Sequence, residues 1–330
     1  MRQTAEIAAV LSQAREILIA CHVNPDGDCL GSSLALAFAL ERRGRRVTVA
    51  SADGVPEMYR FLPDSDRVVR SVDGRTFDAA VGMDCSDLSR LGALAPAMAS
   101  ARTIINIDHH LGNSGYGHLR LWDTRVSAVG ELVYELIEAL GEEVDEAMAA
   151  CLLTAIVTDT GAFRYPNVTP HTLRLSALLM EKGPSPAEII DHVYETRSPG
   201  AVRLLGMVLS RLVLTDGGAI AYASVTREMF RAAGAVPEDT AGIIAFLRSI
   251  RGVKVALLFE EGPTELRGSV RARGGARANV IAEALGGGGH AGAAGFSATG
   301  PLEEVIQQAL ERTRRELAEH VSAQALSVQD

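Results

Sequence analysis

Short apolar segments alternate with helix-like segments over the first 110 residues, and this alternation constrains the fold more than any other feature. Helical apolar spacing is found at 31–43 and is expected at 87–100. The strand candidates are short and partly β-branched, and they are residues 17–21, 46–50, 78–84 and 102–108. Strands that alternate with helices form a mostly parallel sheet. The N-terminal part is therefore predicted to be an α/β domain.

Acidic and histidine residues lie where these strands would end. They are His22, Asp26 and Asp28 after the first segment, Asp84 after the third, Asp108, His109 and His110 after the fourth, and Asp159 at the end of the apolar run LLTAIVT. Taken singly, each is also typical of a turn, a helix cap or a solvated loop. Because ligands of parallel sheets bind beyond the carboxyl ends of the strands, we expect these side chains to meet at one rim.

Four carboxylates on one rim repel one another unless cations lie between them. The charges of Asp26, Asp28, Asp84 and Asp159 balance those of two divalent ions, which predicts a two-metal site. A mixture of imidazole nitrogen and carboxylate oxygen suits Mn²⁺, with Mg²⁺, Co²⁺ or Fe²⁺ as alternatives. An EF-hand calcium loop is excluded, because the twelfth position counted from Asp26 is Ala37 and not glutamate.

Four segments of the chain resemble, in order, the motifs of the DHH phosphoesterase superfamily. The segments are HVNPDGDCLGS, VGMDCSD, NIDHH and TAIVTDTGAF, which lie within residues 22–163. This superfamily includes RecJ exonucleases, family II pyrophosphatases and NrnA-type nanoRNases that also act on pAp. The resemblance implies an α/β catalytic domain with two divalent cations, and every acidic and histidine position of the motifs is present.

The resemblance also implies a role for each residue of the site. One ion would be held by His22, Asp26 and Asp84, and the other by Asp28, Asp84, His109 and Asp159, with Asp84 bridging. Asp108 would orient the His109 ring from behind. His110 would face the substrate phosphate as an acid or a hydrogen-bond donor. Two metals about 3.5–4 Å apart would generate hydroxide and clamp the attacking and leaving oxygens.

A glycine-rich segment, LGGGGHAGAAGF at 285–296, is the second motif. Its glycines formally match G-x-G-x-x-G, but a dinucleotide fold needs strand, glycines and helix in that order, and here a helix comes first. Successive backbone N–H groups in such a loop can hold a phosphate. The predicted substrate-binding residues are Arg271, Arg273, Gly287, Gly288, Gly289 and His290. The alternative is a tight packing loop with solvated arginines.

This segment, with the residues before it from 269, resembles the GGGH motif of the DHH-associated C-terminal domain. In that family it binds the end of the substrate away from the metals, which implies an active site in the cleft between two domains. Strand-like segments follow the turn-like residues 196–200, so a smaller α/β domain is expected there. The predicted limits are 1–195 for the catalytic domain, 196–205 for a linker and 206–330 for the substrate-binding domain.

The predicted function is a Mn²⁺-dependent phosphodiesterase and exoribonuclease that degrades nanoRNA to mononucleotides and converts pAp to AMP. The expected ligands are short single-stranded RNA or DNA oligonucleotides, because a net charge of −9 disfavours long nucleic acids. The alternatives are a cyclic-di-AMP or pApA phosphodiesterase, an inorganic pyrophosphatase and a non-catalytic nucleotide sensor. Cysteines without C-x-x-C spacing and the lack of a signal or membrane segment predict a cytoplasmic protein. The family resemblance favours a homodimer.

Overall fold

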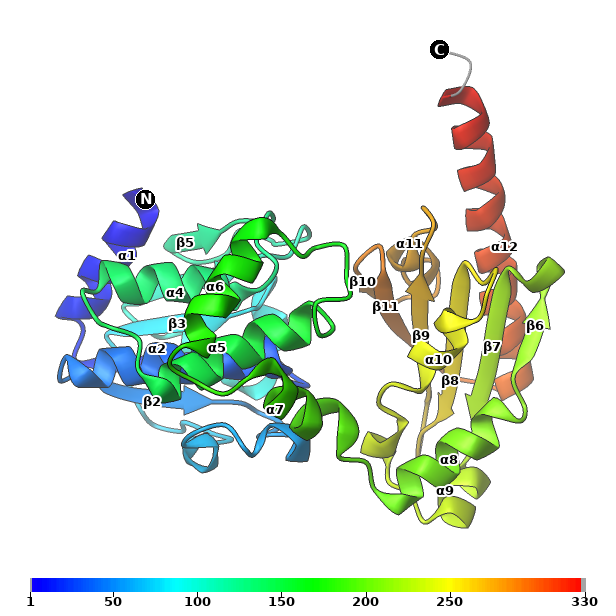
Figure 1. The fold of residues 1–330 in the computed structure, drawn as a ribbon, viewed down its shortest axis with the longest axis horizontal. Coiled ribbons are helices and arrows are strands. Elements are labelled where there is room, and N and C mark those ends of the chain that lie inside the picture. The colour runs from blue at the N-terminus through cyan, green and yellow to red at the C-terminus, as the bar shows by residue number, and fades with distance from the viewer. Residues whose placement is uncertain (1, 328–330) are drawn as a thin grey trace. The chain divides into compact units, whose positions relative to one another are not determined.

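A computed structural model of the chain describes residues 2–327, with the side chains of 3–319. Two compact units follow one another along the chain, Met1–Thr196 and Arg197–Asp330 (Figure 1). The residues predicted as a linker, 196–205, are mostly helical, since α8 begins at Pro199 and is capped by the Ser198 hydroxyl. No helix among the described residues is long and apolar enough to cross a membrane.

The first unit contains a five-stranded sheet in which all neighbouring strands are parallel. Its order is β2-β1-β3-β4-β5, with β1 (Glu16–Cys21) beside β2 (Arg46–Ala50) and β3 (Ala79–Met83), followed by β4 (Thr103–Asp108) and β5 (Leu119–Trp122). The predicted α/β class and four predicted strands are confirmed. The prediction missed β5, because it has only four residues and a single buried side chain, that of Leu121.

Helices cover the sheet and bury its apolar side chains in two clusters of the first unit. They are α1 (Arg2–Gln13), α2 (Gly27–Arg42), α3 (Ala95–Ala99), α4 (Val129–Ala139), α5 (Glu146–Asp159), α6 (Pro170–Met180) and α7 (Pro186–Ile190), which a π-helical turn extends to Glu195. Short 3₁₀ turns lie at Glu57–Tyr59, Ser65–Arg67 and Leu88–Leu94. The helix expected over 87–100 is therefore broken, because Gly92 has a φ of 56°.

The second unit is a mixed six-stranded sheet with helices on both faces. Its order is β10-β11-β9-β8-β7-β6, made of β6 (Val213–Thr215), β7 (Ile220–Val225), β8 (Val255–Glu261), β9 (Leu266–Ala272), β10 (Gly288–Gly289) and β11 (Ala293–Ala298). The pair β7–β8 is parallel and the other pairs are antiparallel. The helices are α8 (Pro199–Leu209), α9 (Arg227–Ala233), α10 (Ile243–Ser249), α11 (Ala278–Glu283) and α12 (Leu302–Ser327).

Strand β8 explains why this second sheet is covered twice. Val255, Leu257 and Phe259 face a core shared with α11 and α12. Ala256 and Leu258, which point the other way, face a core shared with α8, α9 and α10. A strand with an unbroken apolar run, here residues 255–259, is buried on both faces, as this one is.

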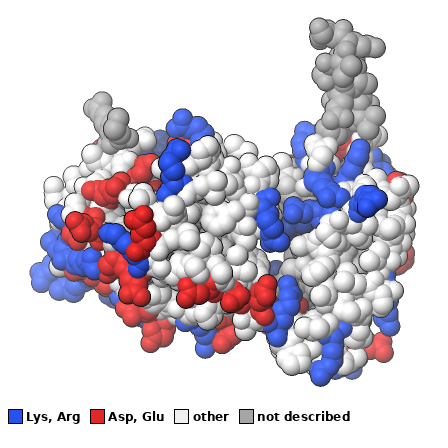
Figure 2. Space-filling model, viewed as in Figure 1, with Lys and Arg blue, Asp and Glu red and all other residues white. Residues whose placement is uncertain are grey.

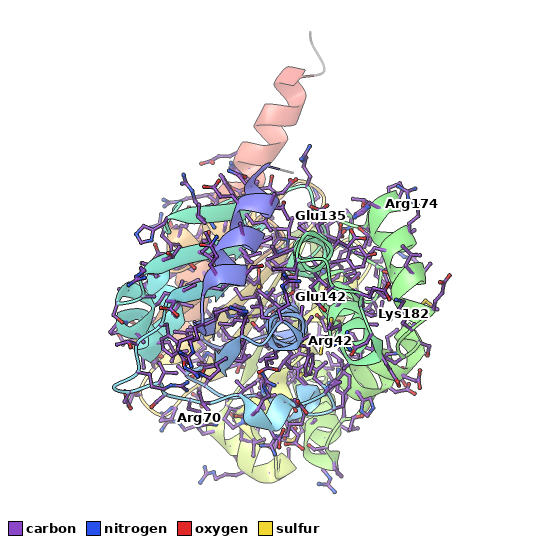
Figure 3. The ribbon with its side chains drawn as sticks, turned by 90° about the vertical axis from the view of Figure 1, so that its left-hand side faces the viewer. Arg42, Arg70, Glu135, Glu142, Arg174 and Lys182 are labelled. Carbon is purple, nitrogen blue, oxygen red and sulfur yellow. The ribbon has the colours of Figure 1, made fainter. Side chains whose placement is uncertain are left out.

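Charge is distributed unequally between the two units. The first has 17 Lys and Arg against 27 Asp and Glu, whereas the second has 15 against 14. Acidic side chains gather over part of the visible face of the first unit, and basic ones are prominent on the second (Figure 2). Charged side chains of α4 and α6 such as Glu135 and Arg174 extend outward from the first unit (Figure 3). An anionic substrate therefore meets a more favourable surface charge on the second unit.

Candidate metal centre

The end of β1 places three of the predicted ligands close together. His22 follows the strand directly, Asp26 is the N-cap of α2, and Asp28 lies in its first turn. The Asp26 carboxylate accepts a hydrogen bond from the Cys29 N–H at 3.0 Å. Helix α2 begins at Gly27 and not at residue 31 as predicted, because this cap satisfies a free N–H group of the first turn.

Asp84 lies at the centre of the cluster, directly after β3. Its φ of 51° is in the left-handed region, which aspartate tolerates better than most residues. The Asp84 N–H donates to the Ile107 carbonyl at 2.9 Å, which fixes the turn. Its Oδ2 is 3.5 Å from His22 Nε2, and its Oδ1 is 3.6 Å from His109 Nε2. One buried carboxylate therefore faces histidines from two different strand ends.

Asp159 completes the cluster from a helix. It is the last residue of α5, and its Oδ2 lies 3.6 Å from His109 Nε2. Ligand atoms within 4.8 Å of one another occur in two groups of three residues, which are His22, Asp26 and Asp84, and Asp28, His109 and Asp159. A third such group joins Asp84 to His109 and His110. The structure thus brings together all six predicted ligands, and their metal-binding role stays a prediction.

Asp28 is the most constrained of these carboxylates. Its Oδ1 accepts hydrogen bonds from the Ser32 hydroxyl at 3.1 Å and from the Gly130 N–H at 3.0 Å. Its Oδ2 accepts one from the Val129 N–H at 2.7 Å. A carboxylate offers about four lone-pair sites, and three are used here. Asp28 therefore retains one position, on Oδ2, for a further ligand.

The acidic cluster requires positive charge. Burial, and then the charge of Asp84, raise the pKa of both Asp28 and Asp159 well above the usual carboxyl range. Burial lowers the pKa of His22, but hydrogen bonds to Asp26 and Asp84 outweigh this and raise it to about 11. In the protein without bound metal, protons on these side chains therefore supply the positive charge that cations would otherwise supply.

The surroundings of the Asp84 carboxylate indicate whether a metal fits this site. Its Oδ1 is buried and lies 3.3 Å from His110 Nδ1 and 3.6 Å from His109 Nε2, but neither contact has hydrogen-bond geometry. A buried anionic oxygen that accepts no hydrogen bond is costly, so a further ligand on it is favourable. Oxygen and imidazole donors on both sides of this atom suit a divalent cation of the Mn²⁺ or Mg²⁺ type. The donor set therefore fits two such cations with Asp84 between them.

One predicted role is wrong, because Asp108 does not orient His109. Asp108 Oδ1 is hydrogen-bonded to His110 Nδ1 at 2.7 Å, and Asp108 Oδ2 accepts a hydrogen bond from the Asn113 side chain. His109 Nδ1 instead faces the Val126 carbonyl oxygen at 3.5 Å. Alternate residues of an extended chain point the same way, so Asp108 faces His110 and not the residue between them.

Further contacts hold His110 in place. Burial lowers its pKa, but the hydrogen bond to Asp108 and the nearby Asp84 carboxylate, 3.3 Å away, outweigh this and raise it to about 10. The indole Nε1 of Trp122 donates to the His110 carbonyl at 2.9 Å. The sequence did not indicate this contact, because Trp122 is 12 residues away and its strand, β5, was not recognised.

The predicted substrate-binding arginines lie on or next to β9 in the second unit. Arg271 is in the strand, opposite Ala293 of β11. Arg273 donates two hydrogen bonds, from Nε to the Val253 carbonyl at 2.5 Å and from Nη2 to the Ile250 carbonyl at 2.7 Å. These bonds tie Arg273 to the connection between α10 and β8. The geometry thus favours a structural role for Arg273 and leaves substrate binding to Arg271 as the prediction.

The predicted glycine loop forms the short edge strand β10 and the turn into β11. A side chain at Gly287 would overlap the Gly295 carbonyl, and one at Gly289 would come within 2.6 Å of Ala294. These two glycines are therefore required for packing, as the structural alternative predicts. Gly288 is exposed, two residues before His290, and a side chain there would meet nothing within 4 Å. Packing alone does not explain this glycine.

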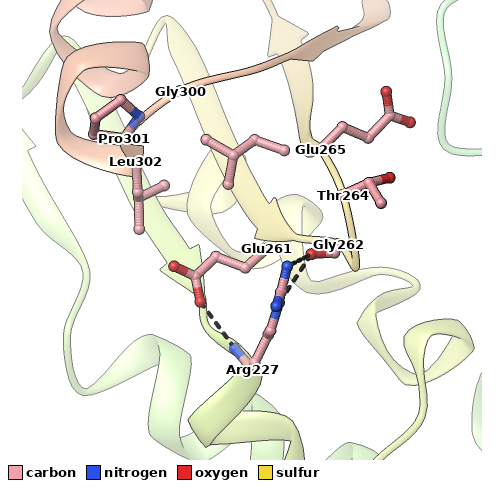
Figure 4. Close-up of a pocket in the computed structure, with 9 residues that line it drawn as sticks. Arg227, Glu261, Gly262, Thr264, Glu265, Gly300, Pro301 and Leu302 are labelled. Carbon is pink, nitrogen blue, oxygen red and sulfur yellow. Dashed lines mark hydrogen bonds between the residues drawn. The ribbon is translucent and has the colours of Figure 1, made fainter.

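A cavity of about 340 Å³ also lies in the second unit, between the β8–β9 turn and the start of α12 (Figure 4). Arg227 donates to the Gly262 carbonyl across it, and Glu261 accepts a hydrogen bond from the Arg227 N–H at 3.0 Å. None of the predicted substrate-binding residues lines this cavity. It is therefore separate from the predicted glycine-loop site.

Comparison with known proteins agrees with both motifs. The DHH family N-terminal domain matches residues 16–156, and the DHHA1 domain matches residues 217–319. A bifunctional oligoribonuclease and PAP phosphatase NrnA from Thermus thermophilus is 37% identical, over 96% of this chain and 94% of that protein. The chain belongs to the DHH family.

Two further similar proteins extend the comparison. The Bacillus subtilis protein of the same name is 28% identical over 88% of this chain and 92% of its own length. The crystal structure of an exopolyphosphatase-related protein from Bacteroides fragilis is 27% identical, with a TM-score of 0.89. It covers 95% of this chain and 96% of that protein. The similarity thus extends over both units, and the family resemblance inferred from the motifs is confirmed.

Proposed function

We propose that this protein is a metal-dependent phosphoesterase that hydrolyses short oligoribonucleotides to mononucleotides and pAp to AMP. The observation that carries the proposal is the pair of three-residue ligand groups, one of which contains the buried Asp84 carboxylate whose Oδ1 accepts no hydrogen bond. The names of the Thermus and Bacillus relatives supply the substrate class. In this proposal residues 1–195 carry the hydrolytic chemistry, and residues 206–330 bind substrate.

Each residue of the cluster has a proposed role. His22, Asp26 and Asp84 hold one divalent cation, whereas Asp28, Asp84, His109 and Asp159 hold the other. Mn²⁺ is the proposed metal because the donors mix imidazole and carboxylate. When bound, the two cations polarise a phosphate oxygen and lower the pKa of a water molecule.

The remaining groups orient the substrate. His110, fixed through its ring by Asp108 and through its carbonyl by Trp122, donates a hydrogen bond to the reacting phosphate. The proposed contacts of the second unit are Arg271, His290 and the backbone of the exposed Gly288. Arginine forms paired hydrogen bonds with phosphate oxygens, and a glycine backbone lets a phosphate approach closely. In this proposal a nucleotide substrate needs these groups of the second unit, whereas pyrophosphate hydrolysis needs the first unit alone.

The test compares substrates at equal concentration with Mn²⁺ and the purified protein. The substrates are pAp, a ribonucleotide trimer, pApA, cyclic-di-AMP, pyrophosphate and a 24-nucleotide single-stranded RNA. The proposal predicts the highest kcat/KM for the trimer and pAp, and a marked fall for the long RNA, which an acidic protein repels. Preference for cyclic-di-AMP or pApA would support the dinucleotide alternative, and preference for pyrophosphate would overturn the proposal. Light scattering of the same sample tests the expected homodimer.

A further inference from the structure

A buried glutamate, Glu131 of α4, takes no part in the proposed chemistry but lies behind the cluster. Its side chain is about 1% exposed, although glutamate is rarely buried without a purpose. Its Oε1 accepts hydrogen bonds from the Ser127 N–H at 3.1 Å and from the Thr172 hydroxyl at 2.8 Å. The Ser127 and Thr172 hydroxyls are themselves 2.6 Å apart. Glu131 thus fixes the turn that leads into α4.

This turn, Val126–Gly130, contacts two ligands of one metal position directly. The N–H groups of Val129 and Gly130 bind the Asp28 carboxylate, at 2.7 and 3.0 Å. The Val126 carbonyl oxygen lies 3.5 Å from His109 Nδ1, which places His109 Nε2 toward the cluster.

The turn reaches the third ligand through Asn167. The Asn167 side-chain amide donates to the Ser127 carbonyl at 3.0 Å and to the Asp159 carbonyl at 3.2 Å. The Ser127 hydroxyl in turn donates to the Asn167 carbonyl at 2.7 Å. Asp28, His109 and Asp159 are therefore all supported by one turn.

The other ligand group has different supports. His22 Nδ1 faces the Val23 carbonyl at 2.8 Å, and Asp26 accepts from the Cys29 N–H. Val23 belongs to the β1–α2 connection, and Cys29 lies in the first turn of α2. No hydrogen bond between residues that the structure describes links either side chain to the Val126–Gly130 turn.

We infer that Glu131 is a positioning residue for one metal only, the ion held by Asp28, His109 and Asp159. Groups behind metal ligands set ligand orientation, and their loss typically costs about 10–100-fold in affinity. Loss of the Glu131 carboxylate frees the turn and so lowers affinity at one position while the other is preserved. This inference rests on the two-metal centre of the proposed function.

The test is a calorimetric titration of the metal-free protein with Mn²⁺, together with the electron paramagnetic resonance spectrum of the loaded sample. The wild type is expected to bind two equivalents and to show spin coupling between them. Glu131→Ala is expected to bind one equivalent normally and the second at least tenfold more weakly. When Mn²⁺ is limiting, the spin coupling between the two ions should therefore be lost. Glu131→Gln retains an acceptor oxygen, so it is expected to restore both equivalents.

Two further variants make the result decisive. Glu135→Ala changes an exposed glutamate one turn along the same helix and is expected to leave both equivalents unchanged (Figure 3). Asn167→Ala removes the link to Asp159 without changing α4, and it is expected to weaken the same single equivalent if Glu131→Ala fails to fold. Unchanged binding in both Glu131→Ala and Asn167→Ala, or equal weakening of both equivalents in the folded variants, would overturn the inference. A wild type that binds fewer than two equivalents would instead refute the two-metal centre.

Discussion

Helices α2 and α5 must pack closely for the ligand cluster to form, and Gly31 makes this possible. A Cβ at Gly31 would overlap the carbonyl oxygen of Cys151 and lie 3.2 Å from its carbon and 3.3 Å from the Ala155 nitrogen. All three atoms belong to the backbone of α5, which cannot rotate aside as a side chain can. The substitution Gly31→Ala therefore forces the two helices apart.

The size of the effect follows from this geometry. The Cβ regains ordinary van der Waals contact only if the helices separate by about 1 Å. Gly31 lies one turn from Asp28, and Cys151 lies two turns from Asp159, so the separation moves two ligands of one metal apart. Overpacking of this kind costs about 1–3 kcal/mol of stability. A displacement of about 1 Å at a reacting centre lowers the rate by about 100-fold.

The assay is kcat/KM for a ribonucleotide trimer at saturating Mn²⁺, together with the thermal unfolding midpoint. Gly206→Ala is the matched control, because Gly206 also lies within a helix and a Cβ there meets nothing within 4 Å. Alanine is favoured over glycine in a helix by about 0.5–1 kcal/mol, so Gly206→Ala should keep full activity and unfold at the same or a higher temperature. A folded Gly31→Ala protein with kcat/KM within twofold of the wild type would refute the reasoning.

Three further predictions follow from the site. Asp84→Asn should lower kcat at least 1,000-fold and reduce the number of bound Mn²⁺ ions by calorimetry, whereas Asp87→Asn, in the half-buried turn that follows, should change neither. Chelation of the metal should abolish hydrolysis and lower the thermal unfolding midpoint, since the folded state then loses the stabilisation that a bound ligand gives it, and added Mn²⁺ should restore both. Gly288→Ala should raise KM for pAp about tenfold with little change in stability, whereas Gly292→Ala, in the same loop and equally free of neighbours, should leave KM unchanged.

Much of the first unit could be predicted because its acidic and histidine residues directly follow its strands in the sequence. In a parallel sheet the carboxyl ends of the strands share one edge, so polar residues after separate strands must be neighbours. His22, Asp84 and His109 follow three adjacent strands, β1, β3 and β4, in the observed order. Only the strand order was needed to bring these residues together.

Other features depend on side-chain direction and on long-range contacts, which a residue pattern does not contain. The partner of Asp108 could be His109 or His110, and only the backbone at the end of β4 decides between them. Glu131 has the spacing of an ordinary helix residue, and its importance depends on Thr172, 41 positions away. In the glycine loop, neighbouring glycines that look alike in the sequence differ, because packing requires Gly287 but not Gly288.

The central claim, a two-metal centre in the first unit, is tested most directly by anomalous X-ray scattering from crystals grown with Mn²⁺. The account predicts two peaks at the manganese absorption edge. One should lie among His22, Asp26 and Asp84, and the other among Asp28, His109 and Asp159, with Asp84 in contact with both. A single peak, or peaks located away from these six residues, would contradict it.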